Sequence, residues 1–139
     1  MKNKTLMYKQ FKSYNVAKKK EYAGLTYDSN FEAGYAQELD LRQKAGEILK
    51  WERQINLNLA VNGFIVCQYR IDFIVYYPDN TIEYVECKGY PTPVWKLKWK
   101  LFEALYSDLP DVKLTVIQQG RFKAPKPRRV KNYRQFNNN

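Results

Sequence analysis

The stretch from residue 64 to residue 88 constrains the fold more than any other part of this 139-residue chain. Residues 64–77 (FIVCQYRIDFIVYY) are β-branched and aromatic throughout, which predicts a central strand. Pro78-Asp79-Asn80 is a turn signal, and residues 81–88 (TIEYVECK) predict the next strand. The two runs therefore predict a β-hairpin with a three-residue loop at 78–80.

The loop length sets the register of this hairpin. With residues 78–80 in the loop, residue 77 pairs with residue 81, and Asp72 then faces Glu86 on the same side of the sheet. Because side chains alternate between the two faces of a sheet, Lys88 lies on that side as well, next to Glu86. A register slipped by one residue still leaves the two carboxylates as diagonal neighbours.

Two carboxylates held face to face across a sheet repel each other. At ~4–5 Å the Coulomb cost runs from about 1 kcal/mol in water to about 4 kcal/mol at an effective dielectric constant of 20. The neighbouring Ile71, Phe73 and Val85 are apolar, so the pair is expected to be partly buried. A hard divalent cation is the simplest reason for such a pair, because carboxylates, water and a main-chain carbonyl such as that of Cys87 suit Mg²⁺ or Mn²⁺.

Lys88 then gains a chemical role. A lysine beside a metal-bound water lowers the pKa of that water, orients it, or stabilises charge on a phosphate in the transition state. Asp72, Glu86 and Lys88 together predict a site for phosphodiester hydrolysis. The alternative is an acid–lysine ion pair on an exposed hairpin face, worth roughly a few tenths of a kcal/mol, and the spacing by itself does not exclude it.

A helix is predicted before the hairpin, over residues 28–47. Asp28 or Ser29 can cap its start, and Glu32 follows Ser29 by three residues, which is the capping-box spacing. Gly46 marks its end.

The remaining elements complete one domain. Residues 48–61 contain an alternating, half-exposed strand, and Asn62-Gly63 is a strong turn signal. Residues 93–107 predict a second helix and residues 112–118 a last strand. The order α-β-β-β-α-β predicts a single α/β (α+β) domain, in which one mixed sheet is flanked by helices.

The positive charge of the chain, a net +10, is concentrated at its two ends. Residues 1–24 carry seven lysines and one acid, and residues 121–139 carry seven lysines or arginines and no acid, whereas residues 25–120 have a net charge of −3. We therefore divide the chain into a basic N-terminal arm (1–24), a core domain (25–120) and a basic, flexible C-terminal tail (121–139). Such arms are typical of nucleic-acid binding, and solvated, solubilising tails are the alternative.

Composition excludes several other classes of protein. Histidine is absent, which excludes an imidazole base and His-ligated metals. Cys67 and Cys87 form no CxxC pair, so neither a zinc site nor a disulfide framework is predicted. No apolar run approaches the roughly 20 residues that span a bilayer, and the basic N-terminus lacks the apolar stretch of a secretory signal. We expect a cytoplasmic protein without a membrane partner.

The pattern Asp72-x13-Glu86-x-Lys88, on a hairpin preceded by one helix and followed by another, resembles the PD-(D/E)XK nuclease superfamily over roughly residues 26–118. It is closest to small phage-encoded members and to Holliday-junction resolvases, although Ile71 stands where the name motif has proline. The resemblance implies a restriction-endonuclease-like core and Mg²⁺ or Mn²⁺ as cofactor. It also implies Asp72 and Glu86 as metal ligands and Lys88 as the catalytic lysine.

The resemblance adds residues outside the hairpin. The superfamily often supplies a catalytic, metal-binding Glu from the first helix, and Glu32 matches that position; a helix-capping carboxylate is the alternative, and the two roles are compatible. The helix after the Glu-x-Lys strand often adds a basic residue, so Lys96 and Lys100 are predicted phosphate contacts, with a solvated basic face as the alternative. In the two arms the predicted nucleic-acid contacts are Lys18, Lys19, Lys20, Arg121, Lys123, Arg128 and Arg129.

Three functions remain open. The first is a metal-dependent, structure-selective DNA endonuclease that cuts Holliday junctions or other branched DNA during phage recombination in an infected bacterium. A domain of this size has little room for a base-reading module, which favours recognition of shape, and two symmetric cuts would require a homodimer. The second is a sequence-specific or nicking endonuclease. The third is a non-catalytic nucleic-acid-binding protein on a nuclease fold.

Overall fold

The computed structural model describes residues 7–10, 21–26, 29–119 and 122–131. Its strands are β1 (Met7–Gln10), β2 (Glu21–Tyr22), β3 (Leu25–Thr26), β4 (Lys50–Val61), β5 (Phe64–Tyr76), β6 (Ile82–Lys88) and β7 (Val112–Gln118), and its helices are α1 (Asn30–Lys44) and α2 (Pro93–Tyr106). Five strands form one sheet in the order β1-β7-β6-β5-β4, and β2 and β3 form a separate small hairpin.

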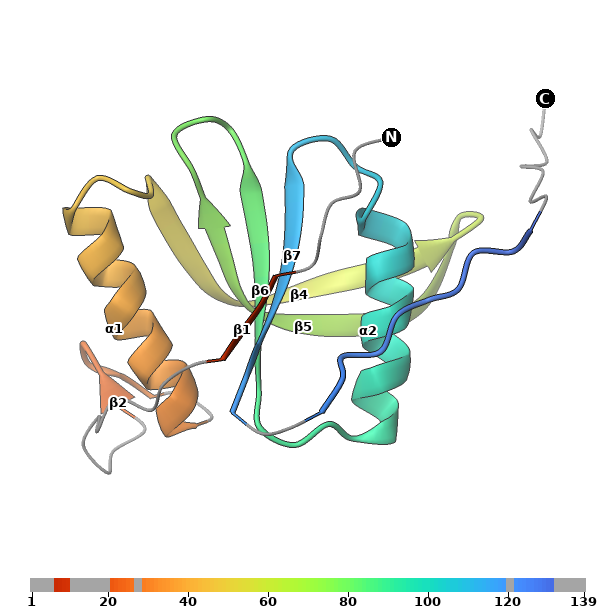
Figure 1. Ribbon diagram of the computed structural model, residues 1–139, viewed down its shortest axis with the longest axis horizontal. Coiled ribbons are helices and arrows are strands. Elements are labelled where there is room, and N and C mark those ends of the chain that lie inside the picture. Colours follow the sequence, from red (N-terminus) through yellow and green to blue (C-terminus); the bar gives the residue numbers. More distant parts are fainter. Residues whose placement is uncertain (1–6, 11–20, 27–28, 120–121, 132–139) are drawn as a thin grey trace.

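The α+β fold class and the mixed sheet are confirmed. Strands β4, β5 and β6 are antiparallel neighbours, whereas β6 and β7 run parallel. The predicted order is reproduced by α1-β4-β5-β6-α2-β7. One apolar cluster lies between α1 and the sheet and a second lies between α2 and the sheet, so the helices flank it on two sides (Figure 1). Neither helix in the described ranges is long and apolar enough to cross a membrane.

Local signals explain where the helices begin and end. The Ser29 hydroxyl accepts a hydrogen bond from the Glu32 N–H (3.1 Å) and caps α1, as the capping-box spacing predicts. Gly46, with a φ of +78°, follows the end of α1 in the left-handed conformation that glycine adopts without strain. The Thr92 hydroxyl caps α2 by accepting from the Trp95 N–H (3.2 Å). Helix α1 is shorter than the predicted range at both ends.

The predicted hairpin register is confirmed. The Tyr77 N–H donates to the Thr81 carbonyl (2.9 Å) across the loop, and Tyr76 lies opposite Ile82. The same register continues as far as Phe73 opposite Val85. The loop at 78–80 therefore determines the alignment of the two strands that carry the carboxylates.

Beyond that point the alternation of side chains in β5 is broken. Ile71 and Ile74 both pack in the cluster under α2, although they are three residues apart, while Phe73 packs on the α1 side. In β4, Gln54 has a φ of +50°, and the regular pairing of β4 with β5 skips Gln54 and Asp72, so the ladder is irregular at this position. The far parts of β4 and β5 then pass behind α2 (Figure 1). The expectation that Asp72 pairs directly with Glu86 in a regular ladder is therefore wrong, because the paired stretch ends one residue earlier.

Strand β1 lies inside the segment predicted to be an N-terminal arm. It pairs in parallel with β7, from Met7 opposite Thr115 to Gln10 opposite Gln118, and extends the sheet at the β7 edge. Residues 7–10 therefore belong to the sheet. Residues 1–6 and 11–20 lie outside the described residues.

The C-terminal strap, residues 122–131, lies within the segment predicted to be a flexible tail. It runs along α2 (Figure 1), where the Phe122 ring packs edge-on against Trp95 at a centroid distance of 6.1 Å and Ala124 is buried. The Gln118 side-chain amide donates to the Phe122 carbonyl (2.6 Å), and Arg129 forms an ion pair with Asp108 (2.7 Å). These contacts place residues 122–131 against the domain, and the flexibility of the tail stays a prediction. Residues 132–139 lie outside the described residues.

Candidate active site

The two predicted acids come together where β5 and β6 separate. The Cys87 N–H donates to Asp72 Oδ2 (2.8 Å), so the Asp72 side chain, rather than a main-chain carbonyl, satisfies this amide of β6. Asp72 is partly buried. Glu86, which directly precedes Cys87 in β6, is buried. The end of the regular ladder thus places one carboxylate from each strand at the same point of the sheet.

Glu86 is held by a short chain of hydrogen-bond donors. Although it is only 5% exposed, its Oε2 accepts from the Tyr69 hydroxyl (2.8 Å), which in turn accepts from the Trp95 indole N–H (3.2 Å). Tyr69 and Trp95 are both buried in the cluster under α2. Burial and the charge of Glu86 raise the pKa of the Tyr69 phenol, so this group keeps its proton and remains a donor. These two hydrogen bonds, from Trp95 to Tyr69 and from Tyr69 to Glu86, fix the orientation of the Glu86 carboxylate.

Lys88 lies on the same side of the sheet as predicted. Its Nζ is 3.9 Å from Glu86 Oε1 and 5.0 Å from the centre of the Trp95 ring, so the ammonium contacts both an anion and a π-face. The side chain is 21% exposed. The alternative of an ion pair on an exposed hairpin face is therefore wrong, because the glutamate is buried and only the lysine reaches solvent.

The site concentrates negative charge. Burial is the main reason why the pKa of Glu86 lies well above its usual range, and the charge of Asp72 adds to it. The Tyr69 hydrogen bond and the Lys88 charge act in the opposite direction, and Glu32 raises the pKa further. The pKa of the buried Cys87 thiol is raised as well, first by burial and then by Asp72 and Glu86. A cation near these groups would relieve their mutual repulsion.

Glu32 lies in the first turn of α1, close enough for its charge to act on Glu86. It is 8% exposed, and the Ser29 hydroxyl contacts its Oε1 (3.4 Å). The Ser29 cap predicted at Glu32 is thus present, and the buried Glu32 carboxylate acts on Glu86 through its charge. Its role as a metal ligand stays a prediction.

Comparison with known proteins gives one family. Residues 11–124 match the family described as Protein of unknown function (DUF1064). The chain belongs to the DUF1064 family. No curated protein and no solved structure matches it. The matched range contains Glu32, Asp72, Glu86 and Lys88, so the whole candidate site lies within the family's domain.

The donor set of this DUF1064 chain fits a hard divalent cation. Within the described residues, no three acidic or thiol side chains are grouped so that they could hold a metal ion together. Mg²⁺ does not require such a group, because it keeps several of its waters and is usually bound by one or two carboxylates. Asp72 and Glu86 would supply these two. Cys87 is tied to the site by its N–H, and the predicted role of its carbonyl as a further ligand stays a prediction.

Those predicted phosphate contacts that fall within the described residues lie at least partly at the surface. Lys96 is exposed and Lys100 partly exposed on α2, the helix that supplies Trp95. In the strap, Lys123 and Arg128 are exposed, whereas Arg129 is engaged by Asp108. Lys18, Lys19, Lys20 and Arg121 lie outside the described residues.

Sequence reasoning missed Tyr69 and Trp95 in the DUF1064 site. Tyr69 stands three residues before Asp72, and Trp95 stands in the first turn of α2, so no short motif links them to Glu86. The only sequence signal was a general rule: the O–H of a buried Tyr and the N–H of a buried Trp usually form a hydrogen bond. That rule predicts that such residues have partners, but it does not say which ones.

Proposed function

We propose that this DUF1064 chain is a Mg²⁺-dependent endodeoxyribonuclease that hydrolyses phosphodiester bonds. The observation that carries the proposal is the buried Glu86 carboxylate beside Asp72 and Lys88, in the spacing that resembles the PD-(D/E)XK superfamily. Burying an anion next to a second anion is unfavourable unless a cation balances them. An acid pair with a neighbouring lysine is the minimal set for metal-dependent phosphate ester cleavage.

Asp72 and Glu86 would hold the cation, which supplies Lewis-acid activation of the phosphate ester and of the attacking water. The Tyr69–Trp95 chain keeps the Glu86 carboxylate in one orientation, so little rearrangement is needed when the site is used. Lys88 extends past Glu86 towards solvent, where its ammonium can contact a phosphate oxygen and stabilise the charge that develops there.

The substrate class rests on the charge distribution and on the resemblance. Residues 1–24 and 121–139 carry the whole positive excess of the chain, which suits contacts to phosphate on either side of a cut. We propose branched DNA, such as a Holliday junction, as the preferred substrate, cut by a homodimer in phage DNA recombination. A sequence-specific or nicking endonuclease remains the second candidate on the same site.

A substrate panel tests this proposal. Four-way, flap and linear duplex DNA would be incubated with the full chain, with Mg²⁺ and with EDTA. Mg²⁺-dependent cleavage of the branched substrates supports the first candidate, and discrete bands from long linear duplex support the second. If no DNA is cut in Mg²⁺ or Mn²⁺, the enzyme proposal fails and a non-catalytic nucleic-acid-binding protein remains.

Asp72→Asn separates a catalytic carboxylate from a structural one. The amide oxygen can still accept from the Cys87 N–H, so the fold should survive, while the charge that holds the cation is lost. We expect cleavage to fall by about 10³-fold while DNA binding is retained. Circular dichroism is the control, and a variant that no longer folds would show that the carboxylate is structural.

A further inference from the structure

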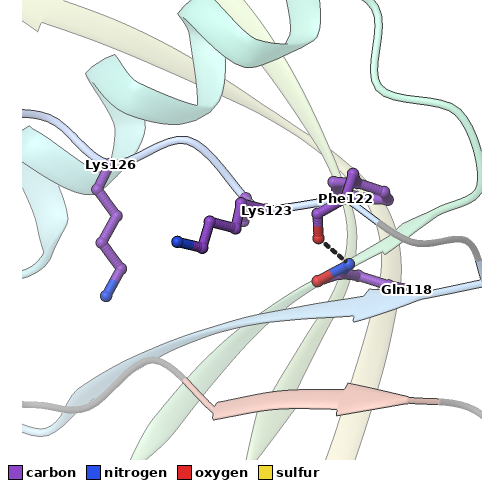
Figure 2. A pocket seen from close by; sticks show the side chains of 5 residues that line it. Gln118, Phe122, Lys123 and Lys126 are labelled. Carbon is purple, nitrogen blue, oxygen red and sulfur yellow. Dashed lines mark hydrogen bonds between the residues drawn. The ribbon is translucent and has the colours of Figure 1, made fainter.

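A pocket of about 600 Å³ lies between the C-terminal strap and the sheet. It is lined by Gln118 of β7 and by Phe122, Lys123, Ala124 and Lys126 of the strap. Figure 2 shows the two lysine side chains reaching from the strap into the space beside β7, with the Gln118 amide joined to the Phe122 carbonyl at its other end. Lys123 is one of the predicted nucleic-acid contacts, but the site proposed above for hydrolysis uses none of these residues.

The pocket adjoins the candidate active site through β7 and α2. Gln118 lies opposite Lys88 on the neighbouring strand, and the Gln119 N–H donates to the Lys88 carbonyl (3.1 Å). Phe122, at the pocket wall, packs against the Trp95 ring, and Trp95 also contacts the Lys88 ammonium and the Tyr69 hydroxyl. One tryptophan therefore forms part of the support for both places.

The lining has the chemistry of a nucleotide site. Two lysines and no acid give it a charge of +2, while Phe122 and Ala124 provide an apolar surface. The buried Glu103 carboxylate of α2 lies close enough to Lys126 for the lysine charge to lower its pKa, against the larger effect of burial, which raises it. An anion joined to a flat apolar ring, which is a phosphate with its nucleobase, complements cations beside an aromatic side chain.

We propose that this pocket binds a nucleotide of the DNA strand next to the phosphodiester that is cut. This inference rests on the proposed nuclease function and adds to it a binding site on the strap side of Lys88. Lys123 and Lys126 contact the phosphates, and Phe122 with Ala124 contacts the base. The strap is thus part of the substrate-binding surface. This role explains why a segment so rich in Lys and Arg makes defined contacts with α2.

Binding in EDTA tests the pocket without cleavage. A fluorescein-labelled single-stranded DNA 12-mer would be titrated with the full chain and followed by fluorescence anisotropy at several salt concentrations. For K123Q/K126Q we expect affinity to fall by about tenfold near 0.1 M salt and the salt slope to fall by about 1.4, which is about 0.7 for each lost phosphate contact. K123R/K126R keeps both charges and should retain wild-type affinity.

The matched control is K44Q/K50Q, which removes two exposed lysines at the end of α1 and the start of β4. Helix α1 flanks the sheet on the side away from α2 (Figure 1). An equal loss in the control pair and the pocket pair would overturn the proposal. As a second measurement on the wild-type chain, the 12-mer should slow acetylation of Lys123 and Lys126 more than that of Lys44.

The two proposals fail separately. If the protein binds DNA through the pocket lysines but never cuts it, the binding-site proposal stands and the nuclease proposal fails. If the wild type cuts DNA and K123Q/K126Q binds DNA as tightly as K44Q/K50Q, the nuclease proposal stands and the pocket proposal fails. Absence of any DNA binding by the wild-type chain would remove both.

Discussion

Strand β6 carries two buried glutamates that differ sharply in their surroundings. Glu83 is 4% exposed and Glu86 is 5% exposed, so water solvates neither carboxylate well. Glu83 accepts hydrogen bonds from Tyr77 (2.7 Å) and Thr115 (2.5 Å) and lies 3.5 Å from the Lys113 ammonium. Glu86 accepts from Tyr69, has its lysine farther away at 3.9 Å, and lies beside Asp72.

This difference distinguishes a structural acid from a candidate functional one. Three donors surround Glu83, which is the expected arrangement for a buried charge that stabilises the fold. Glu86 has a second acid in its vicinity, and that acid and burial both raise its pKa. Such an environment stabilises the charged form poorly until a cation arrives, and it is the kind of environment in which functional groups are found. Removing each of the two charges in turn tests this distinction.

The largest expected effect is on cleavage. Glu86→Gln removes one of the two carboxylates proposed to hold the cation, so we expect Mg²⁺-dependent DNA cleavage to fall by about 10³-fold. Glu83→Gln should leave cleavage by the folded protein unchanged and instead lower the free energy of unfolding by about 1–3 kcal/mol, since three donors lose a charged acceptor. Gel assays of junction cleavage and urea unfolding measure the two quantities.

The reverse pattern would contradict this assignment. If Glu83→Gln abolished cleavage in a protein that is still folded, the acid with more hydrogen-bond donors would be the functional one. If Glu86→Gln cut DNA normally, Glu86 would not be needed to hold the cation.

Each of the two glutamates has a lysine partner, Lys88 for Glu86 and Lys113 for Glu83. Lys88→Met keeps the apolar stem over Trp95 but removes the ammonium from the site, and we expect the cleavage rate to fall by about 10²-fold at saturating DNA. Lys113→Met removes the matching ammonium from Glu83 and should leave the cleavage rate unchanged. Single-turnover kinetics measure both, and partial recovery in Lys88→Arg would show that charge at this position is what matters. Equal losses in the two Met variants would mean that these lysines act only on stability.

Local patterns were enough to predict the elements α1-β4-β5-β6-α2-β7 and the hairpin register, but not strands β1, β2 and β3. The three-residue loop at 78–80 and the period of two in the strands are properties of adjacent residues, and from these the sequence places Asp72, Glu86 and Lys88 in one region. The capping box at Ser29 and Glu32 is likewise local. The fold class followed from the order of these elements.

Long-range packing accounts for what was missed. No local signal reports that the β4–β5 ladder is irregular at Gln54 and Asp72, because this depends on how both strands pack under α2. The contact of the strap with the domain was missed as well, because Phe122 finds an apolar partner in Trp95, which comes from a different part of the sequence. Partners that are distant in sequence can be recognised only once the fold brings them together.

The smallest expected effect is on the pH dependence of stability in EDTA. The pKa of Glu86 is raised in the fold, mainly by burial and then by Asp72, above the ordinary value of 4.5 that applies when the chain is unfolded. As pH rises above about 4.5, the unfolded chain releases this proton while the folded chain still holds it, so the free energy of unfolding decreases until the folded pKa is passed. The slope from one such group is at most about 1.4 kcal/mol per pH unit. Glu86→Gln lacks this slope, so its free energy of unfolding relative to that of the wild type should increase with pH. Subtracting the two free energies removes the contribution of other buried acids, such as Glu103, which both proteins share. Urea unfolding at several pH values measures this difference, and two curves that stay parallel would show that Glu86 is already charged in the metal-free fold.

Adding Mg²⁺ at neutral pH should stabilise the wild type and not Glu86→Gln, because a cation bound only by the folded chain shifts the equilibrium by mass action.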